Sequence, residues 1–204
     1  MANSRPDHLP LMESFHTIQG EGVFTGQASF FIRLGGCDVG CVWCDVKDSW
    51  DASRHPLVSV VDMVSNAKKS GAPIAVVTGG EPAMHPLELL TAGLKSAGIR
   101  THIETSGACE ITGEWDWVCL SPKKFKLPVP SSYQKANELK VIVYHKSDLE
   151  WALEQASKVG PECILLLQPE WSREKEMTTL IVDFVKKHQN WRISLQTHKY
   201  MNIP

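Results

Sequence analysis

The sequence has no long apolar run and almost no net charge. A membrane-spanning helix needs about 20 consecutive apolar residues, and no segment of this 204-residue chain approaches that length. The 21 Lys and Arg residues nearly balance the 23 Asp and Glu residues, which leaves a formal net charge of −2. The sequence therefore predicts neither a membrane nor a nucleic acid as the partner of this protein.

Two further absences narrow the class of protein. The first ten residues are polar and include Pro6 and Pro10, so they do not resemble a secretory signal peptide. We therefore expect a cytoplasmic protein whose cysteines are reduced or bound to metal. No internal repeat or low-complexity segment interrupts the chain, and an apolar content of 43% fits one globular domain over residues 1–204.

Short apolar runs and helical patterns alternate along most of the chain. We expect residues 1–12 to form a loose N-terminal arm and residues 15–22 to form a polar loop. The predicted strands are residues 28–34, 73–77, 100–104, 117–120, 139–144, 163–168 and 191–196. The predicted helices are residues 59–67, 86–97, 147–158 and 174–188, two of which begin with capping boxes, at Ser59–Asp62 and Ser147–Glu150.

This order of elements predicts the fold class. Strands that alternate with helices are typical of an α/β fold with mostly parallel strands. Two of the connections between strands lack a helix, and the chain is shorter than the roughly 250 residues of a complete eight-stranded barrel. We therefore predict a partial, open TIM-like barrel in which the reactive groups gather at the carboxyl ends of the strands.

Three of the six cysteines, Cys37, Cys41 and Cys44, follow the first predicted strand closely. Their C-x3-C-x2-C spacing on the loop 37–44 lets three thiolates converge, which suits zinc or an iron–sulfur cluster. A closed structural zinc site needs a fourth ligand, which Cys109 or a histidine would have to supply. A four-iron cluster held by three thiolates instead keeps one iron open to a substrate. The spacing alone favours neither metal.

A further pair of motifs favours the iron–sulfur cluster. Trp43 directly precedes the third cysteine, and the turn Thr78-Gly-Gly-Glu-Pro82 ends the second predicted strand. Together with the three cysteines, these motifs resemble the radical S-adenosylmethionine (SAM) superfamily. The resemblance implies a [4Fe–4S] cluster whose open iron binds SAM, and an external, flavodoxin-like reductant that supplies one electron to cleave SAM. The 5′-deoxyadenosyl radical formed in this way takes a hydrogen atom from the substrate.

A finer resemblance extends over nearly the whole chain. The motifs that carry it are Phe15-His-Thr-Ile-Gln-Gly-Glu-Gly22, Arg33 before Gly-Gly-Cys37, Thr78-Gly-Gly-Glu-Pro82, Glu104-Thr-Ser-Gly107, Ser121-Pro-Lys123, Asn137-Glu-Leu-Lys140, Gln168-Pro169 and Gln196-Thr-His-Lys-Tyr-Met-Asn-Ile-Pro204. They are similar to the 7-carboxy-7-deazaguanine synthase family. The resemblance implies conversion of 6-carboxy-5,6,7,8-tetrahydropterin to 7-carboxy-7-deazaguanine in queuosine and 7-deazapurine biosynthesis. It also implies release of ammonia, catalytic use of SAM and a homodimer.

The same resemblance assigns residues to each ligand. The cluster ligands are Cys37, Cys41 and Cys44. The residues expected to contact the pterin substrate are Ile18, Gln19, Gly20, Glu21, Arg33, Thr78, His198 and Pro204. The residues expected to contact SAM are Trp43, Cys44, Asp45, Gly80, Glu81, Thr105, Ser121, Lys123 and Gln168. The last segment, residues 196–204, is expected to bring the terminal carboxylate of Pro204 against the substrate.

Arg33 lies in an otherwise apolar run, where an unpaired charge is costly. The resemblance implies that its guanidinium holds the substrate carboxylate through two hydrogen bonds, a geometry that lysine cannot copy. The alternative is an internal ion pair. In the segment Gln19–Glu21, an amide and a carboxylate suit the flat donor–acceptor edge of a pterin, and the alternative there is an ordinary surface loop.

Val46 departs from the pattern of the family, because many members carry threonine or serine at this position and bind Mg²⁺ through its hydroxyl. Valine offers no side-chain oxygen to a hard cation, so we expect either weak or absent Mg²⁺ dependence or a Mg²⁺ ion whose coordination is completed by water and substrate. Two other functions stay open, a non-catalytic zinc-binding α/β module and a radical SAM activase that acts on a protein partner. Arg33 and the Gln19–Glu21 segment favour a small-molecule substrate over a protein.

Overall fold

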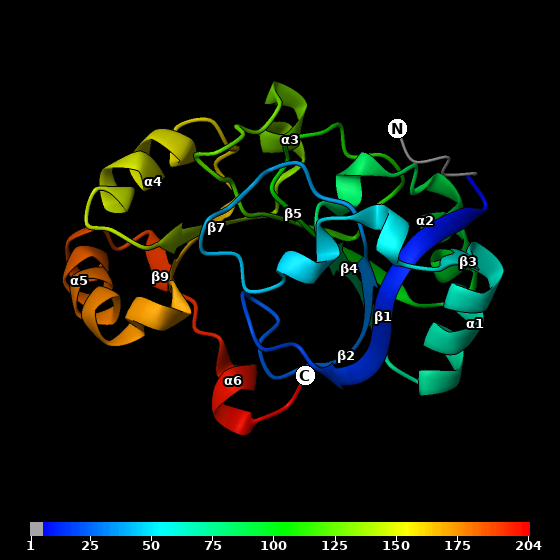
Figure 1. Ribbon diagram of the computed structural model, residues 1–204. Coiled ribbons are helices and arrows are strands. Elements are labelled where there is room, and N and C mark those ends of the chain that lie inside the picture. Colours follow the sequence, from blue (N-terminus) through cyan, green and yellow to red (C-terminus); the bar gives the residue numbers. More distant parts are fainter. Residues whose placement is uncertain (1–5) are drawn as a thin grey trace.

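The computed structural model describes residues 6–204, which form one continuous sheet covered by helices (Figure 1). The strands are β1 (His8–Ile18), β2 (Ala28–Leu34), β3 (Leu57–Ser59), β4 (Ile74–Gly79), β5 (Arg100–Thr105), β6 (Trp117–Leu120), β7 (Glu138–Val143), β8 (Ile164–Pro169) and β9 (Trp191–Ile193). The helices are α1 (Val60–Ser70), α2 (Glu88–Ser96), α3 (Pro130–Lys135), α4 (Asp148–Ala156), α5 (Glu174–Lys187) and α6 (Thr197–Met201).

The sheet is a curved row of strands in the order β3–β1–β2–β4–β5–β6–β7–β8–β9. From β2 to β9 every neighbouring pair is parallel, whereas β1 pairs antiparallel with both β2 and β3. The row does not return to its first strand, so the barrel stays open. Figure 1 shows α1, α2, α4 and α5 outside the curve of the sheet. The prediction of an α/β fold with a partial, open barrel is confirmed.

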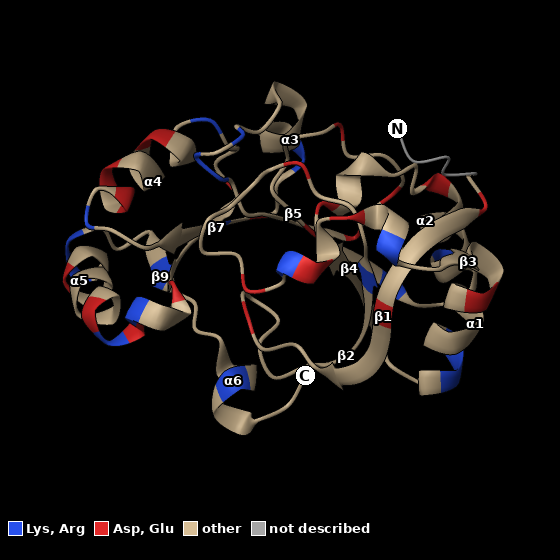
Figure 2. Cartoon of the chain, in the orientation of Figure 1, with Lys and Arg blue, Asp and Glu red and all other residues tan. Residues whose placement is uncertain are grey.

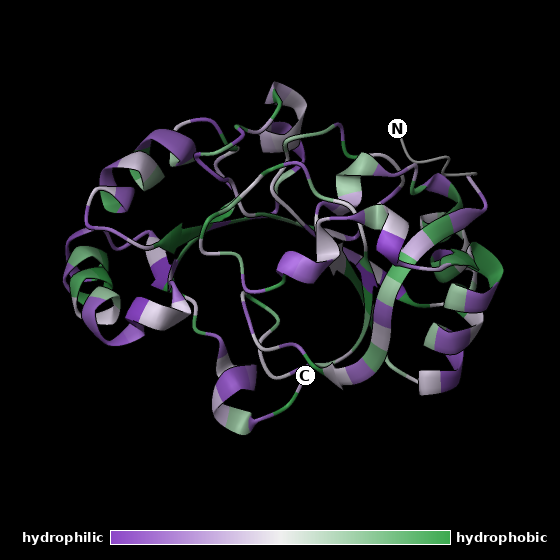
Figure 3. Ribbon diagram, viewed as in Figure 1, coloured by the Kyte–Doolittle hydropathy of each residue, from purple (hydrophilic) through white to green (hydrophobic). Residues whose placement is uncertain are grey.

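Two apolar clusters fix the helices to the outer face of the sheet. One joins Met63 of α1 and Leu90 of α2 to the strands of the first half of the sheet. The other joins Met177 and Ile181 of α5 to Trp191 of β9 and the strands of the second half. In Figure 3, β7 is accordingly green, whereas β1 alternates between purple and green. Burial of these side chains is the main force that holds the barrel together.

Every predicted strand and helix is present; the strands at 28–34 and 117–120 have the predicted ends, and the ends of the others differ by a few residues. Helix α1 has the predicted N-terminal cap, because the Ser59 hydroxyl accepts a hydrogen bond from Asp62 N, and Gly71 ends the helix with a φ of 72°. The capping box predicted at Ser147 is wrong, since Ser147 makes no capping hydrogen bond. The neighbouring Asp148 carboxylate accepts hydrogen bonds from the backbone at 144 and 145 instead.

The N-terminal prediction is also wrong where the structure describes it. Strand β1 begins at His8, so residues 8–12 are not a loose arm, and the predicted loop at 15–22 begins as strand up to Ile18. Residues 1–5 of the predicted arm lie outside the described residues. Much of β1 is polar and only partly buried, so it lacks the apolar run by which the other strands were found.

The second half of the chain differs from the prediction at its end. Strand β9 stops at Ile193 rather than at residue 196, and the short helix α6 follows. Gln196 and Thr197 leave the sheet because they bond with the loop after β1. Within residues 6–204, no helix combines the length and the apolar content that a bilayer crossing requires. Figure 2 shows acidic and basic residues interspersed over the helices.

Candidate active site

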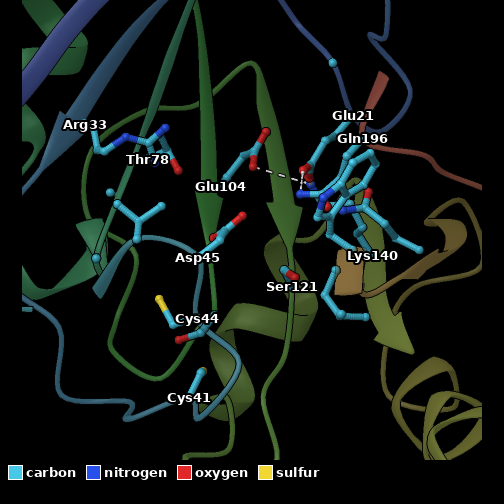
Figure 4. A pocket seen from close by; sticks show the side chains of 18 of the residues that line it. Glu21, Arg33, Cys41, Cys44, Asp45, Thr78, Glu104, Ser121, Lys140 and Gln196 are labelled. Atoms are coloured by element: carbon cyan, nitrogen blue, oxygen red, sulfur yellow. Dashed lines mark hydrogen bonds and ion pairs between the residues drawn. The ribbon is translucent and has the colours of Figure 1, made fainter. Parts of the chain in front are cut away.

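The carboxyl ends of the parallel strands meet at a cavity of about 260 Å³. All eight residues expected to contact the substrate line this cavity, and so do the three cysteines of the loop 37–44. The residues expected to contact SAM line it as well, with the exception of Glu81. Figure 4 shows Arg33 and Thr78 on one side of the cavity and Glu21 and Lys140 on the other.

The cysteine loop is held in place by its backbone. After β2, Gly36 N donates to Ser49 O at 2.6 Å and Cys37 N donates to Trp50 O at 3.0 Å. Gly80, just after β4, passes so close to this segment that a side chain at its position would overlap Gly36 O. The glycine-rich turn predicted after the second strand thus lets two strand ends pack together beneath the cysteines.

The three cysteines suit an iron–sulfur cluster by their chemistry. Cys41 is buried against Val39, and Cys37 and Cys44 pack against the same small apolar group. Burial raises the pKa of Cys37, and it raises the pKa of Cys41 to about 11, so these thiolates need a bound cation. Soft thiolates on one loop that faces a cavity fit a four-iron cluster, in which each thiolate binds a different iron atom.

A mononuclear zinc site is not favoured by the same residues. Within residues 6–204, no three His, Cys, Asp or Glu side chains are grouped so that they could hold one metal ion. Cys109, one of the two alternatives for a fourth zinc ligand, packs with the apolar cluster of the first half of the sheet. Its position therefore does not support a zinc site completed by Cys109.

Arg33 forms one wall of the cavity together with Thr78, its neighbour in register on β4. Arg33 Nε donates to Glu13 Oε1 at 2.7 Å, so an ion pair is present, and the same guanidinium lines the cavity. Phe15 and Phe31 continue this wall, with their rings stacked and their centroids 5.5 Å apart. The wall thus combines a flat apolar surface with a cationic group.

Comparison with known proteins decides the family. The Radical SAM superfamily profile matches residues 31–113. Over 204 residues the chain is 57% identical to the 7-carboxy-7-deazaguanine synthase of Flavobacterium psychrophilum, a match that covers 100% of this chain and 97% of that protein. It is 48% identical to the 7-carboxy-7-deazaguanine synthase of a Synechocystis species, over 95% of this chain and 93% of that protein.

The chain belongs to the 7-carboxy-7-deazaguanine synthase family. A crystal structure of QueE from Escherichia coli superposes with a TM-score of 0.85 and 33% sequence identity. That match covers 94% of this chain and 95% of the other. The family resemblance read from the motifs of the sequence is thereby confirmed, and so is its radical SAM chemistry.

The cavity wall opposite Arg33 in this synthase-family protein contains a buried charge network. It was not predicted from the sequence. Lys140 of β7 lies between the carboxylates of Glu21 and Glu104 and is only 3% exposed. Burial lowers the pKa of Lys140, but Glu104 and Glu21 outweigh burial and raise it well above its usual value. For Lys140 the available signal was a charge directly before the apolar run 141–143, whereas β5 around Glu104 is mostly polar and gave no such signal.

Glu21 is also strongly affected by this network. Burial by itself raises the pKa of Glu21, but the charge of Lys140 and the hydrogen bonds from Lys140 and Gln196 lower it from 4.5 to about 2. Gln196 Nε2 donates to Glu21 Oε1 at 2.8 Å, and Gln19 Nε2 donates to Glu104 Oε1 at 2.9 Å. The Glu21 carboxylate is therefore ionised, and hydrogen bonds hold the loop that is expected to contact the substrate.

Residues from the far end of the chain hold the same loop. Thr197 N donates to Gly20 O at 2.9 Å, and the Ser194 hydroxyl accepts a hydrogen bond from Gly22 N at 2.9 Å. His198 and Pro204 line the cavity next to this loop, and Thr17 Oγ1 donates to Pro204 O at 3.3 Å. The segment 196–204 thus completes the cavity, while contact of the Pro204 carboxylate with a substrate stays a prediction.

Glu81 departs from its predicted place in this family's site. Its side chain is 1% exposed and does not line the cavity. The carboxylate accepts hydrogen bonds from Ala83 N at 3.0 Å, from Ser106 N at 2.8 Å and from the hydroxyls of Thr105 and Ser106. Through these bonds the carboxylate joins the turn after β4 to the loop after β5, and contact of Glu81 with SAM stays a prediction.

Of the remaining residues expected to contact SAM, Trp43, Ser121 and Lys123 lie close together. Lys123 Nζ lies 5.8 Å from the ring centroid of Trp43 and donates to Ser121 Oγ at 2.7 Å. Burial lowers the pKa of Lys123. Thr105 and Gln168 lie at the ends of β5 and β8 and line the same cavity. Aromatic, cationic and hydroxyl groups are thus present for a nucleoside and a carboxylate.

Proposed function

We propose that this protein converts 6-carboxy-5,6,7,8-tetrahydropterin to 7-carboxy-7-deazaguanine, with release of ammonia and catalytic use of SAM. The observation that carries the proposal is the single cavity that joins the three-cysteine loop to both the Arg33 wall and the Lys140 network. Family membership agrees with it, since relatives that match over nearly the whole chain carry the name of this activity.

The two walls of the cavity match the two ends of the substrate. On one side, Arg33 and the Thr78 hydroxyl offer donors to a carboxylate. On the other side, Glu21, Glu104 and the Gln19 amide offer acceptors to the N–H groups on the edge of a pterin. Each carboxylate oxygen accepts more than one hydrogen bond, so the bonds to Lys140 and Gln196 leave room for the ligand. The substrate is thereby oriented from both ends.

Cys37, Cys41 and Cys44 would hold the cluster, and Trp43, Ser121, Lys123 and Gln168 would hold SAM next to it. When bound, the cluster and SAM supply the radical that removes a hydrogen atom from the substrate. The protein positions the substrate against this centre and keeps water away from it, because the segment 196–204 closes part of the cavity.

We infer that Mg²⁺ is not required. Val46 lines the cavity beside Asp45 and has no oxygen in its side chain for the ion. Lys199 Nζ lies 3.3 Å from Asp45 Oδ2 and lines the same cavity, so it offers a positive charge there without a metal. An external one-electron reductant, a homodimer and a cytoplasmic location stay predictions.

The test is anaerobic turnover. Protein reconstituted with iron and sulfide is incubated with SAM, a reductant and the carboxytetrahydropterin, and the products are identified by mass spectrometry. The expected result is 7-carboxy-7-deazaguanine together with ammonia. A Cys37→Ala, Cys41→Ala, Cys44→Ala variant is the control and should yield neither product. If protein that cleaves SAM leaves the pterin unchanged, the proposed substrate is wrong, and if only zinc binds, the proposed chemistry is wrong.

A further inference from the structure

A β-bulge in β1 brings Glu13 directly opposite Arg33. Leu11 of β1 pairs with Leu34 of β2, but two residues further along, Glu13 pairs with Arg33. In a regular antiparallel ladder, Arg33 would face Met12 and Glu13 would face Ile32. The bulge therefore changes the register by one residue, which is how bulges commonly redirect a side chain.

The contact between these two side chains uses one specific edge of the guanidinium. Glu13 Oε1 accepts a hydrogen bond from Arg33 Nε at 2.7 Å. Arg33 is 19% exposed and lines the cavity, whereas Glu13 is 46% exposed and does not line it. Among residues 6–204, Glu13 is the only hydrogen-bond partner of the Arg33 side chain. Both terminal NH₂ groups of the guanidinium are thus left for a ligand.

The direction of the free edge follows from the neighbouring strand. Arg33 is in register with Thr78 of β4, and both residues line the cavity. Figure 4 shows the two side chains next to each other at the same wall. Since Glu13 occupies the Nε edge from the side of β1, the two NH₂ groups can receive a carboxylate end-on, beside the Thr78 hydroxyl.

We propose that Glu13 is a positioning residue that fixes the Arg33 guanidinium so that its two NH₂ groups bind the substrate carboxylate end-on. This inference rests on the proposed function, in which Arg33 binds that carboxylate. Glu13 itself does not touch the substrate. Its negative charge repels a second carboxylate only weakly, because nearly half of the side chain is in water and the charge is screened.

The experiment compares two ligands on reconstituted, SAM-loaded protein. The dissociation constants of the carboxytetrahydropterin and of tetrahydropterin without the carboxylate are measured by anaerobic calorimetry. Glu13→Ala should weaken binding of the carboxylated ligand about tenfold, the effect of one charged hydrogen bond, and leave the other ligand unchanged. Glu13→Gln keeps an acceptor for Nε and should restore most of the affinity. Glu176→Ala, which removes an exposed partner of Arg173 on α5, is the matched control and should change neither constant.

A double-mutant cycle separates positioning from a general structural effect. In an Arg33→Ala background, Glu13→Ala should cause no further loss, because the group that it positions is absent. In the single variant Glu13→Ala, the thermal midpoint of unfolding and the rate of SAM cleavage without substrate should equal those of the unmodified protein.

An equal loss for both ligands, an additive loss in the cycle, or full affinity in Glu13→Ala would overturn the role of Glu13. If the unmodified protein binds no carboxytetrahydropterin, the proposed function is wrong and this inference with it. If it binds that ligand and Glu13→Ala binds it equally well, only the inference is wrong.

Discussion

Among the cations that line the cavity, Lys140 and Arg33 lie on opposite walls, and the fold uses their charges differently. Lys140 is almost completely buried between Glu21 and Glu104, so its charge is neutralised within the protein. Arg33 meets one half-exposed carboxylate through one edge and keeps the other edge free. A buried cation with two partners supports the structure, whereas a cation with unused donors at a cavity is suited to a ligand.

Removal of the Lys140 charge should have the largest effect. In Lys140→Met, the largely buried Glu21 and Glu104 carboxylates lose their counter-charge, and the free energy of unfolding should fall by about 3 kcal/mol. Urea denaturation measures this loss. The matched control is Lys126→Met, which breaks an exposed pair with Asp38 and should change the free energy by less than about 1 kcal/mol. Equal losses in the two variants would remove the contrast between the walls.

Substitution of Arg33 should have the opposite effect: substrate binding should weaken strongly, and the free energy of unfolding should change little. Arg33→Ala should raise the KM for the carboxylated pterin about 100-fold, the loss of two charged hydrogen bonds. Arg33→Lys should restore only part of the lost affinity, because an ammonium cannot form the bidentate pair with a carboxylate. Steady-state kinetics gives KM, and urea denaturation should show a change below about 1 kcal/mol. A large loss of stability with normal KM would mean that Arg33 serves only the ion pair.

The Lys140 network should also make stability depend on pH. Because the pKa of Glu21 is about 2 in the folded protein and 4.5 is its ordinary value, its stabilising contribution is complete above pH 4.5 and lost as the pH falls towards 2. The unfolding free energy of the unmodified protein, minus that of Glu21→Gln, should therefore shrink by about 2 kcal/mol between pH 7 and pH 2.5. The measurement uses cluster-free protein. A difference in unfolding free energy that does not change with pH would contradict the lowered pKa of Glu21.

Val46 should give the smallest effect. Addition of Mg²⁺ should change the turnover of the unmodified protein by less than about twofold, because valine supplies no oxygen ligand. Val46→Thr should gain a modest stimulation by Mg²⁺, and Val46→Ala, which also lacks a hydroxyl, is the control. A Mg²⁺ titration of turnover distinguishes these results. Strong stimulation of the unmodified protein would show that water and substrate complete the ion's coordination.

Much of the fold could be predicted because the parallel strands are buried on both faces. Strands such as β4 and β8 therefore appear in the sequence as apolar runs. Strand β1 could not be found in this way, since polar residues such as Glu13 and Thr17 interrupt it. The cysteine loop was predictable from spacing, because its ligands lie close together in the chain.

The charge network and the bulge could not be predicted, for a physical reason. Lys140 meets Glu21 across 119 positions of the chain, so no local pattern joins them. The register of Glu13 depends on one extra residue in a strand, which hydrophobic periodicity does not reveal. The hydrogen bonds of the Glu81 carboxylate could not be predicted either, because a motif indicates which residue is needed, whereas only the packed structure shows its partners.

The contacts of α6 with the loop after β1 have a consequence for how the protein is made. The Thr197 hydroxyl and the Gly20 carbonyl are 177 positions apart, so a chain emerging from the ribosome presents Gly20 long before its partner exists. Contacts of such long range form late in folding. Because residues of the segment 196–204 line the cavity, the cavity is completed only after this segment has been synthesised.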